Sequence, residues 1–118
     1  MKREPALVLA SGLERMTGSG MSLGQALRVT ACQGGQLGRE ARAVSRDIER
    51  GRSLAQSLGR RYGETVIDKA RHAVLEAGER AGNPAAALAL LKEDLEQGHE
   101  ERGHMVSTLA YPALLLVM

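Results

Sequence analysis

Apolar residues recur along the chain at the three- and four-residue spacing of α-helices, in short stretches separated by glycine. The clearest stretch runs from Leu37 to Arg50, where one narrow stripe of a helix turning about 100° per residue is apolar. That stripe consists of Leu37, Ala41, Val44 and Ile48. The pattern predicts short amphipathic helices.

Six helices are expected. They cover about residues 5–17, 22–33, 37–50, 53–58 and 64–81, followed by a sixth helix that begins at Pro84. The residues expected to face inward from the first, second, fifth and sixth helices are Leu9, Leu13, Met16, Leu23, Ala26, Leu27, Thr30, Ile67, Ala70, Val74, Ala77, Leu88, Leu91 and Leu95. Because few residues join consecutive helices, the predicted fold is an all-α, six-helix antiparallel bundle.

The join between the fifth and sixth helices carries the sharpest local signals. Gly82 suits the left-handed conformation that ends a helix, Asn83 is a favourable N-cap, and Pro84 fits a first helical turn. Gly78 and the alanines at 85–87 have small side chains, so the two backbones are expected to approach closely. A helix–helix corner explains these residues, and no catalytic or binding role is needed to account for them.

Two nearly identical segments open the second and fourth helices. They are Gly20-Met-Ser-Leu-Gly-Gln-Ala-Leu27 and Gly51-Arg-Ser-Leu-Ala-Gln-Ser-Leu58. In each, a serine followed three residues later by a glutamine predicts a capping box, formed by Ser22 with Gln25 and by Ser53 with Gln56. The similarity has two interpretations: a repeated helix pair, as in solenoid proteins, or the general preference for such sequences at helix corners.

The chain has no phenylalanine or tryptophan and only two tyrosines, Tyr62 and Tyr111, so its core must be aliphatic. This composition suits helices and argues against an aromatic stacking platform for single-stranded nucleic acid. The one cysteine, Cys32, cannot form an internal disulfide, and we expect it to be a small buried apolar residue.

Charge is distributed unevenly, although the formal net charge is only +2. Basic residues outnumber acidic ones between positions 28 and 71, and acidic residues predominate between positions 76 and 101. Four arginines lie opposite the apolar stripe of the third helix: Arg39, Arg42, Arg46 and Arg50. This row is either a solvated face or a surface for an acidic partner or for lipid headgroups.

No motif for catalysis, cofactor binding or metal binding is found in the sequence. His99 and His104 are five residues apart, about 140° around a helix, so they cannot share a metal ion. The glycines lie at helix corners and not after a strand, which argues against a phosphate-binding loop. No serine or cysteine has the context of a nucleophile, so we do not expect an enzyme.

The segment 109–118 is almost entirely apolar. It is too short to span a bilayer, which takes about 20 apolar residues, and too apolar for a solvated terminus. We therefore expect a domain over residues 1–108 and the truncated start of a transmembrane helix at 109–118, in which Tyr111 suits the headgroup level and Pro112 is tolerated. The alternative is a terminal helix that docks on the core.

Four motifs, in this order along the chain, resemble the F domain of type II secretion systems, which occurs in inner-membrane platform proteins of type II secretion and type IV pilus assembly. The motif residues are Gly20, Ser22 and Leu27; Gly51, Ser53 and Leu58; Gly78, Glu79 and Gly82; and Tyr111 with Pro112. The resemblance covers almost the whole chain. The chain departs from the family pattern at Tyr62-Gly63, where the family usually has Phe-Pro, and at Asn83-Pro84.

The resemblance implies a six-helix cytoplasmic bundle within a protein of the bacterial inner membrane, with no catalytic activity and no cofactor. Its implied partners are a cytoplasmic assembly ATPase, other inner-membrane platform proteins, further copies of the same protein, and pilin or pseudopilin subunits that contact the membrane part. Nucleic acid is not expected as a partner. We predict that the row formed by Arg39, Arg42, Arg46 and Arg50 binds a protein partner. The alternative is a soluble, repeat-like helical adaptor for a protein partner.

Overall fold

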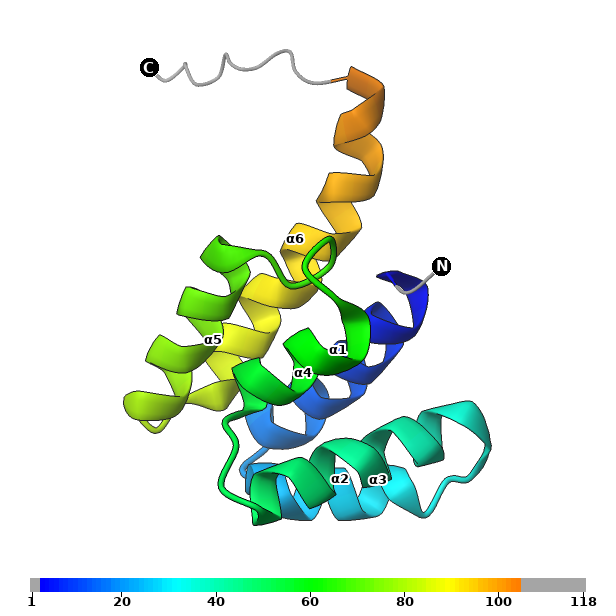
Figure 1. The fold of residues 1–118 in the computed structure, drawn as a ribbon, viewed down its shortest axis with the longest axis vertical. Coiled ribbons are helices and arrows are strands. Elements are labelled where there is room, and N and C mark those ends of the chain that lie inside the picture. Colours follow the sequence, from blue (N-terminus) through cyan, green and yellow to red (C-terminus); the bar gives the residue numbers. More distant parts are fainter. Residues whose placement is uncertain (1–2, 105–118) are drawn as a thin grey trace.

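The computed structural model of the protein describes residues 3–104, with side chains as far as Gln97. Six helices follow one another: α1 (Arg3–Gly18), α2 (Leu23–Ala31), α3 (Gly35–Glu49), α4 (Leu54–Tyr62), α5 (Lys69–Arg80) and α6 (Pro84–His104) (Figure 1). The described residues contain no strand, so the predicted all-α fold of six helices is confirmed. The expected transmembrane start at 109–118, with Tyr111 and Pro112, lies outside the described residues.

The helix α1 is the centre of the bundle. It packs most extensively against α6 and also contacts α2, α3 and α4. The helices α2 and α3 pack together at one end of the molecule, at the bottom of Figure 1, and α5 packs against α6 above them. The core is aliphatic, as the composition predicts. Its fully buried leucines are Leu9, Leu13, Leu27, Leu54, Leu75, Leu88 and Leu95.

The corner between α5 and α6 forms as predicted. Gly82 has a φ of 76°, a conformation that residues with a side chain rarely adopt. The Asn83 side chain accepts a hydrogen bond from the Ala86 N–H at 3.2 Å. A Cβ on Gly78 would overlap the Ala87 Cβ and would lie only 3.2 Å from the Asn83 carbonyl oxygen. The small side chains therefore let α5 and α6 approach closely.

The two predicted capping boxes differ in the structure. At α4 both halves are present: the Ser53 hydroxyl accepts from the Gln56 N–H, and the Gln56 side chain accepts from the Ser53 N–H, both at 3.0 Å. At α2 the Ser22 hydroxyl accepts from the Gln25 N–H at 3.1 Å, but the return bond is absent among the described contacts. The Gln25 side chain is exposed, so its amide has access to solvent in place of the return bond. The prediction at Ser22 is thus only half correct.

The helix α4 is longer than predicted. It continues past Leu58 to Tyr62, and it ends at Gly63, which has a φ of 86°. Tyr62 is buried in the core. Its burial stabilises the additional turn, because tertiary packing contributes more to helix stability than local preference does.

The helix α5 begins later than the predicted position near Glu64. The Asp68 side chain accepts a hydrogen bond from the Arg71 N–H at 2.9 Å and caps the helix at this point. The turn before it buries Val66 and Ile67. The apolar residues that suggested an earlier helix start therefore belong to the connection between α4 and α5.

The buried face of α5 also differs from the prediction. Ala70, Val74 and Ala77, which the pattern predicts to face inward, are exposed. The buried residue of α5 is Leu75, which lies about 130° around the helix from the middle of that stripe. A leucine side chain buries more apolar surface than alanine, so the helix directs Leu75 into the core and leaves the alanines outside.

The single cysteine contradicts the expectation of burial. Cys32 is exposed. It is the C-cap of α2, where the chain turns away from the core toward the loop before α3.

With respect to the membrane, none of the helices in the described part of the chain is long and apolar enough to span a bilayer.

Candidate partner-binding surface

The four arginines predicted to lie opposite the apolar stripe form a row on the outer side of α3, which we call the α3 arginine row. Arg39, Arg42 and Arg46 lie within the helix and Arg50 is its C-cap, and all four are exposed. Among the residues that the structure describes, none of the four forms an ion pair with a carboxylate. Arg42 donates a hydrogen bond to the Ala31 carbonyl oxygen at 3.2 Å. The row is therefore a basic surface that faces solvent.

The inner side of α3 holds this row in place. Ala41 and Val44 are fully buried, and Leu37 and Ile48 pack partly against the core. Gly38 lies directly against α2, because a Cβ at this position would lie 2.9 Å from a carbonyl oxygen of that helix. Close packing of this kind resists rolling and sliding, so the arginines project from a rigid element.

A buried carboxylate joins α3 to α4. Glu40 is 7% exposed and accepts hydrogen bonds from the Tyr62 hydroxyl at 2.6 Å and from Gln36 Nε2 at 2.9 Å. Burial, together with the hydrogen bond to Glu40, raises the pKa of Tyr62 above its ordinary value, so the hydroxyl stays protonated and continues to donate. Each oxygen of Glu40 therefore has a partner, as a buried carboxylate requires.

A second carboxylate of α3 binds the first half of α4. The Ser57 hydroxyl donates to Asp47 Oδ2 at 2.7 Å, and Arg52 Nη1 lies 3.0 Å from Asp47 Oδ1. The hydrogen bond from Ser57 is the main cause of the lowered pKa of Asp47. Partial burial acts in the opposite direction, and the hydrogen bond and positive charge of Arg52 lower the pKa further. These two carboxylates of α3 are therefore structural, whereas its arginines face outward.

Glu79 contacts a helix that is distant in the sequence. Its Oε2 accepts a hydrogen bond from the Leu54 N–H at 2.8 Å, so a side chain of α5 caps the N-terminus of α4 together with Ser53. A carboxylate at the positive end of a helix is stabilising. Its Oε1 is buried and has no hydrogen-bond partner among the described residues. Local patterns could not predict this role, because 25 positions separate Glu79 from Leu54.

The other motif residues within the described part shape the corners and the core. They are Gly20, Gly51 and Gly82 with positive φ values, Gly78 at the α5–α6 contact, Leu27 and Leu58 in the core, and Ser22 and Ser53 as N-caps. They do not converge on one pocket. In residues 3–97, no group of three or more histidine, cysteine, aspartate or glutamate side chains could hold a metal ion.

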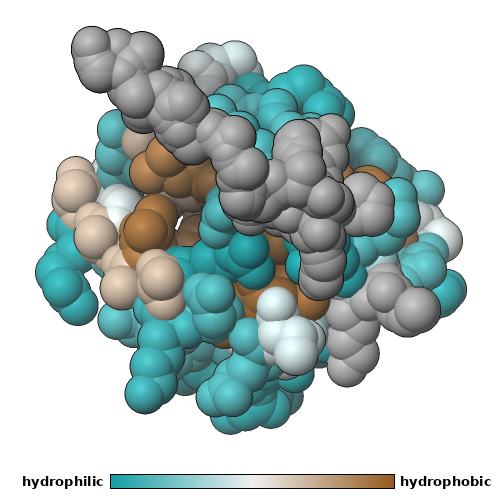
Figure 2. Space-filling view, turned by 90° about the horizontal axis from the view of Figure 1, so that it is seen from above, coloured by the Kyte–Doolittle hydropathy of each residue, from teal (hydrophilic) through white to brown (hydrophobic). Residues whose placement is uncertain are grey.

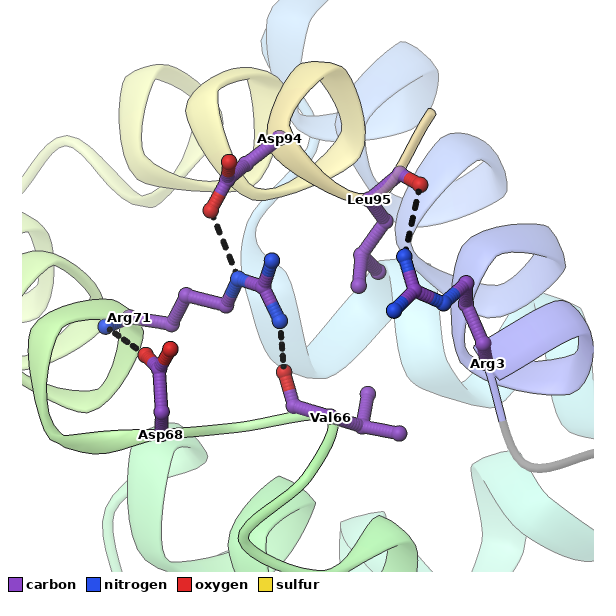
Figure 3. A network of polar contacts seen from close by, with 6 residues as sticks. All are labelled: Arg3, Val66, Asp68, Arg71, Asp94 and Leu95. Atoms are coloured by element: carbon purple, nitrogen blue, oxygen red, sulfur yellow. Dashed lines mark hydrogen bonds and ion pairs between the residues drawn. The ribbon is translucent and has the colours of Figure 1, made fainter. Parts of the chain in front are cut away.

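Polar contacts fix the position of α6 between α5 and α1 (Figure 3). Arg71 of α5 forms an ion pair with Asp94 of α6 at 2.6 Å, and its Nη1 donates to the Val66 carbonyl oxygen at 2.7 Å. On the α1 side, Arg3 donates to the Leu95 carbonyl oxygen at 3.3 Å. The sequence pattern predicts the burial of Leu95 but none of these polar contacts, since their partners are defined only by the tertiary fold.

The α3 arginine row and the C-terminal end of α6 lie at different ends of the molecule. In Figure 1 the α2–α3 pair forms the lower end, and α6 runs from the middle of the bundle to the upper end. The basic surface is therefore well separated from the point at which the chain leaves α6.

Comparison with known families is consistent with the fold and the motifs. The family model for protein F of the type II secretion system (T2SS) matches residues 12–118, which is most of the chain. No match was found among curated proteins. The matched range includes the α3 arginine row, Glu79 and all the corner glycines described above. The chain therefore belongs to the type II secretion system protein F family.

Proposed function

We propose that this chain is the cytoplasmic domain of an inner-membrane platform protein in a type II secretion or type IV pilus assembly machine. Membership of the protein F family supports a structural component of a secretion apparatus. The proposed role is to hold and position other components, without catalysis. The observation that carries a docking role is the exposed α3 arginine row, which projects from a rigid helix and has no carboxylate partner among the described residues.

The row would bind an acidic protein surface. Guanidinium groups aligned along one helix create a positive potential that attracts such a surface and orients it during approach. Because Glu40, Asp47 and the apolar stripe already fix α3, little conformational freedom is lost when a partner binds. We assign this surface to the assembly ATPase or to a neighbouring cytoplasmic component of the machine.

The position of the row favours a protein partner over a lipid surface. If residues 109–118 begin a transmembrane helix, the membrane lies beyond the C-terminal end of α6, whereas the row lies at the opposite end of the bundle (Figure 1). A helix of 21 residues, such as α6, is about 30 Å long. Anionic headgroups act over about a Debye length, roughly 10 Å at 0.1 M salt. The row would therefore lie outside their range.

The remaining partners are proposed on family membership. Other platform proteins and pilin or pseudopilin subunits would contact the membrane part of the full-length protein. Copies of the protein would assemble with one another. The domain described here would then link the membrane part to the cytoplasmic ATPase.

The docking role is tested by charge reversal in the full-length protein, with Arg42→Glu and Arg46→Glu combined. Like charges would then face each other across the interface, so the variant should stay folded but lose co-purification with the ATPase from detergent-solubilised membranes. Secretion or pilus assembly should be lost with it. Binding by the wild type should weaken as salt is added, because exposed charges are screened.

Arg15→Glu combined with Arg61→Glu is the matched control, because both arginines are exposed outside the row and the net charge changes by the same amount. Circular dichroism checks that each protein is folded. A folded row variant that binds the ATPase like the wild type contradicts the proposal. Equal loss of binding in the control contradicts it too, since the effect would then depend on net charge alone.

A further inference from the structure

Four large hydrophobic side chains are exposed on the described surface: Val8, Val29, Val74 and Leu90. Two of them, Val74 of α5 and Leu90 of α6, line a groove of about 300 Å³ between these helices, together with Ala70 and Leu91. Figure 2 shows hydrophobic atoms gathered on the side of the molecule where α5 and α6 lie. An apolar groove of this kind is typical of a site for side chains of another helix.

The rim of the groove is acidic. Glu93, Asp94 and Gln97 of α6 lie along it, with Arg71 of α5 opposite. The charge of Arg71 is matched by its ion pair with Asp94 (Figure 3). Glu93 is exposed and has no ion-pair partner among the described residues. The groove therefore suits an apolar side chain that is accompanied by a positive charge.

The outer side of α2 has the complementary chemistry. Val29 is 41% exposed, and Arg28 beside it is exposed as well. Gln25 and the C-cap Cys32 are exposed on the same side, at the spacing by which a helix presents side chains to a groove. The guanidinium of Arg42 contacts the end of α2 and adds a second positive charge there. We call this surface, formed by Gln25, Arg28, Val29 and Cys32, the α2 stripe.

We propose that the α2 stripe of one copy of the protein docks into the α5–α6 groove of a second copy. Val29 enters between Val74 and Leu90, and Arg28 pairs with Glu93. The groove and the stripe belong to different helix pairs of the bundle (Figure 1), so the contact is head-to-tail. Each copy then keeps one unoccupied surface, and further copies extend the assembly into a ring or a chain.

A second copy is favoured as the occupant because the same chain supplies both halves of the contact. Arg28 of the stripe is the first residue of the basic stretch between positions 28 and 71, and Glu93 and Asp94 on the rim of the groove belong to the acidic stretch between 76 and 101. The arrangement also covers three of the four exposed large hydrophobic side chains. The proposed contact deepens the proposed assembly of copies, and it shares only Arg42 with the α3 arginine row, so Arg28, Val29 and Leu90 test it without changing the row.

The test uses sedimentation of the 118-residue chain at increasing concentration. A stripe variant carries Arg28→Glu with Val29→Asp, and a groove variant carries Leu90→Asp. The wild type should grow beyond a dimer as concentration rises, and less so at high salt. Each variant alone should remain monomeric. An equimolar mixture should form one-to-one dimers that grow no further, because the stripe variant keeps an intact groove and the groove variant keeps an intact stripe.

The mixing step also shows that both variants are folded, since only folded proteins can restore each other's binding. Should Leu90→Asp fail to fold by circular dichroism, Val74→Asp replaces it, because Val74 is exposed and lines the same groove. Val8→Asp is the control, because Val8 is exposed on α1 outside both surfaces, and it should associate like the wild type. The proposal is overturned by a monomeric wild type, by a mixture that stays monomeric, by association that stops at a symmetric dimer, or by association that survives in each variant alone.

Discussion

Several carboxylates of this protein act as acceptors that join one helix to another. Asp47 accepts from Ser57, Glu40 accepts from Tyr62, and Glu79 accepts from the Leu54 N–H, across separations of 10, 22 and 25 positions respectively. All three bonds end on α4, which has only 9 residues. A helix this short is marginal in isolation, so its stability must come from such tertiary contacts.

Glu79→Ala should destabilise the protein measurably. Without the carboxylate, the Leu54 N–H at the start of α4 has lost its acceptor, and leaving such a group unsatisfied costs about 1–3 kcal/mol. Glu79→Gln keeps an acceptor but removes the favourable charge, so its loss should be smaller. Urea denaturation measures both. Glu64→Ala, which removes an exposed carboxylate, is the control, and equal stability of the Glu79→Ala and control variants would refute the capping role.

At the scale of whole helices, the apolar pattern predicts the buried side of α3 correctly and that of α5 incorrectly. The apolar stripe of α3 faces the core and its arginines face solvent, as predicted. In α5 the stripe of Ala70, Val74 and Ala77 faces solvent, and Leu75 faces the core. The difference arises because alanines make a weak stripe, and one leucine of greater apolar area determines the orientation of the helix.

The contact between α3 and α4 should weaken in acid. The folded protein lowers the pKa of Asp47, so this group contributes stability above its unfolded pKa of about 3.9, and the contribution is lost as the pH falls through the folded pKa. Asp47→Asn should therefore destabilise the protein at neutral pH and progressively less below about pH 4. Urea denaturation across this range provides the measurement.

Ser57→Ala serves as the companion variant, because it removes the hydroxyl that is the main cause of the lowered pKa of Asp47. It should reduce the same pH dependence while keeping the carboxylate. A penalty for Asp47→Asn that does not change with pH would show that the carboxylate contributes no proton-linked stability.

At the scale of the whole molecule, α1 joins the two ends of the bundle into one folded unit. It contacts the α2–α3 pair on one side and α6 on the other, and the α5–α6 pair reaches the rest of the bundle through α1 and α4. The arginine row and the α5–α6 groove therefore lie on one continuous bundle whose parts share a core.

Leu13→Ala should lower the stability of the entire bundle in one transition. Leu13 is fully buried on α1, and replacing a buried leucine by alanine typically costs about 2–5 kcal/mol. Helicity in urea should be lost at a lower midpoint and in a single step, since both ends depend on α1. Val8→Ala on the exposed side of the same helix should change stability by only about 0.5 kcal/mol. Two separate transitions would mean that the ends fold independently.

The sequence alone determined the features that depend on residues within one or two helical turns. It predicted six helices, the corner at Gly82, Asn83 and Pro84, the N-cap at Ser53, and the exposed arginine row, because capping and helical periodicity are local properties. The family motifs were likewise visible as ordered local segments.

Only the tertiary structure decided which side of α5 is buried, that Cys32 is exposed, and that Glu79 caps a helix 25 positions away. It also determined that the α5–α6 groove has an acidic rim and that the arginine row lies at the other end from the C-terminus of α6. These properties depend on which helices become neighbours. That choice is made by competition among apolar faces for one core, and the competition involves side chains far apart in the sequence.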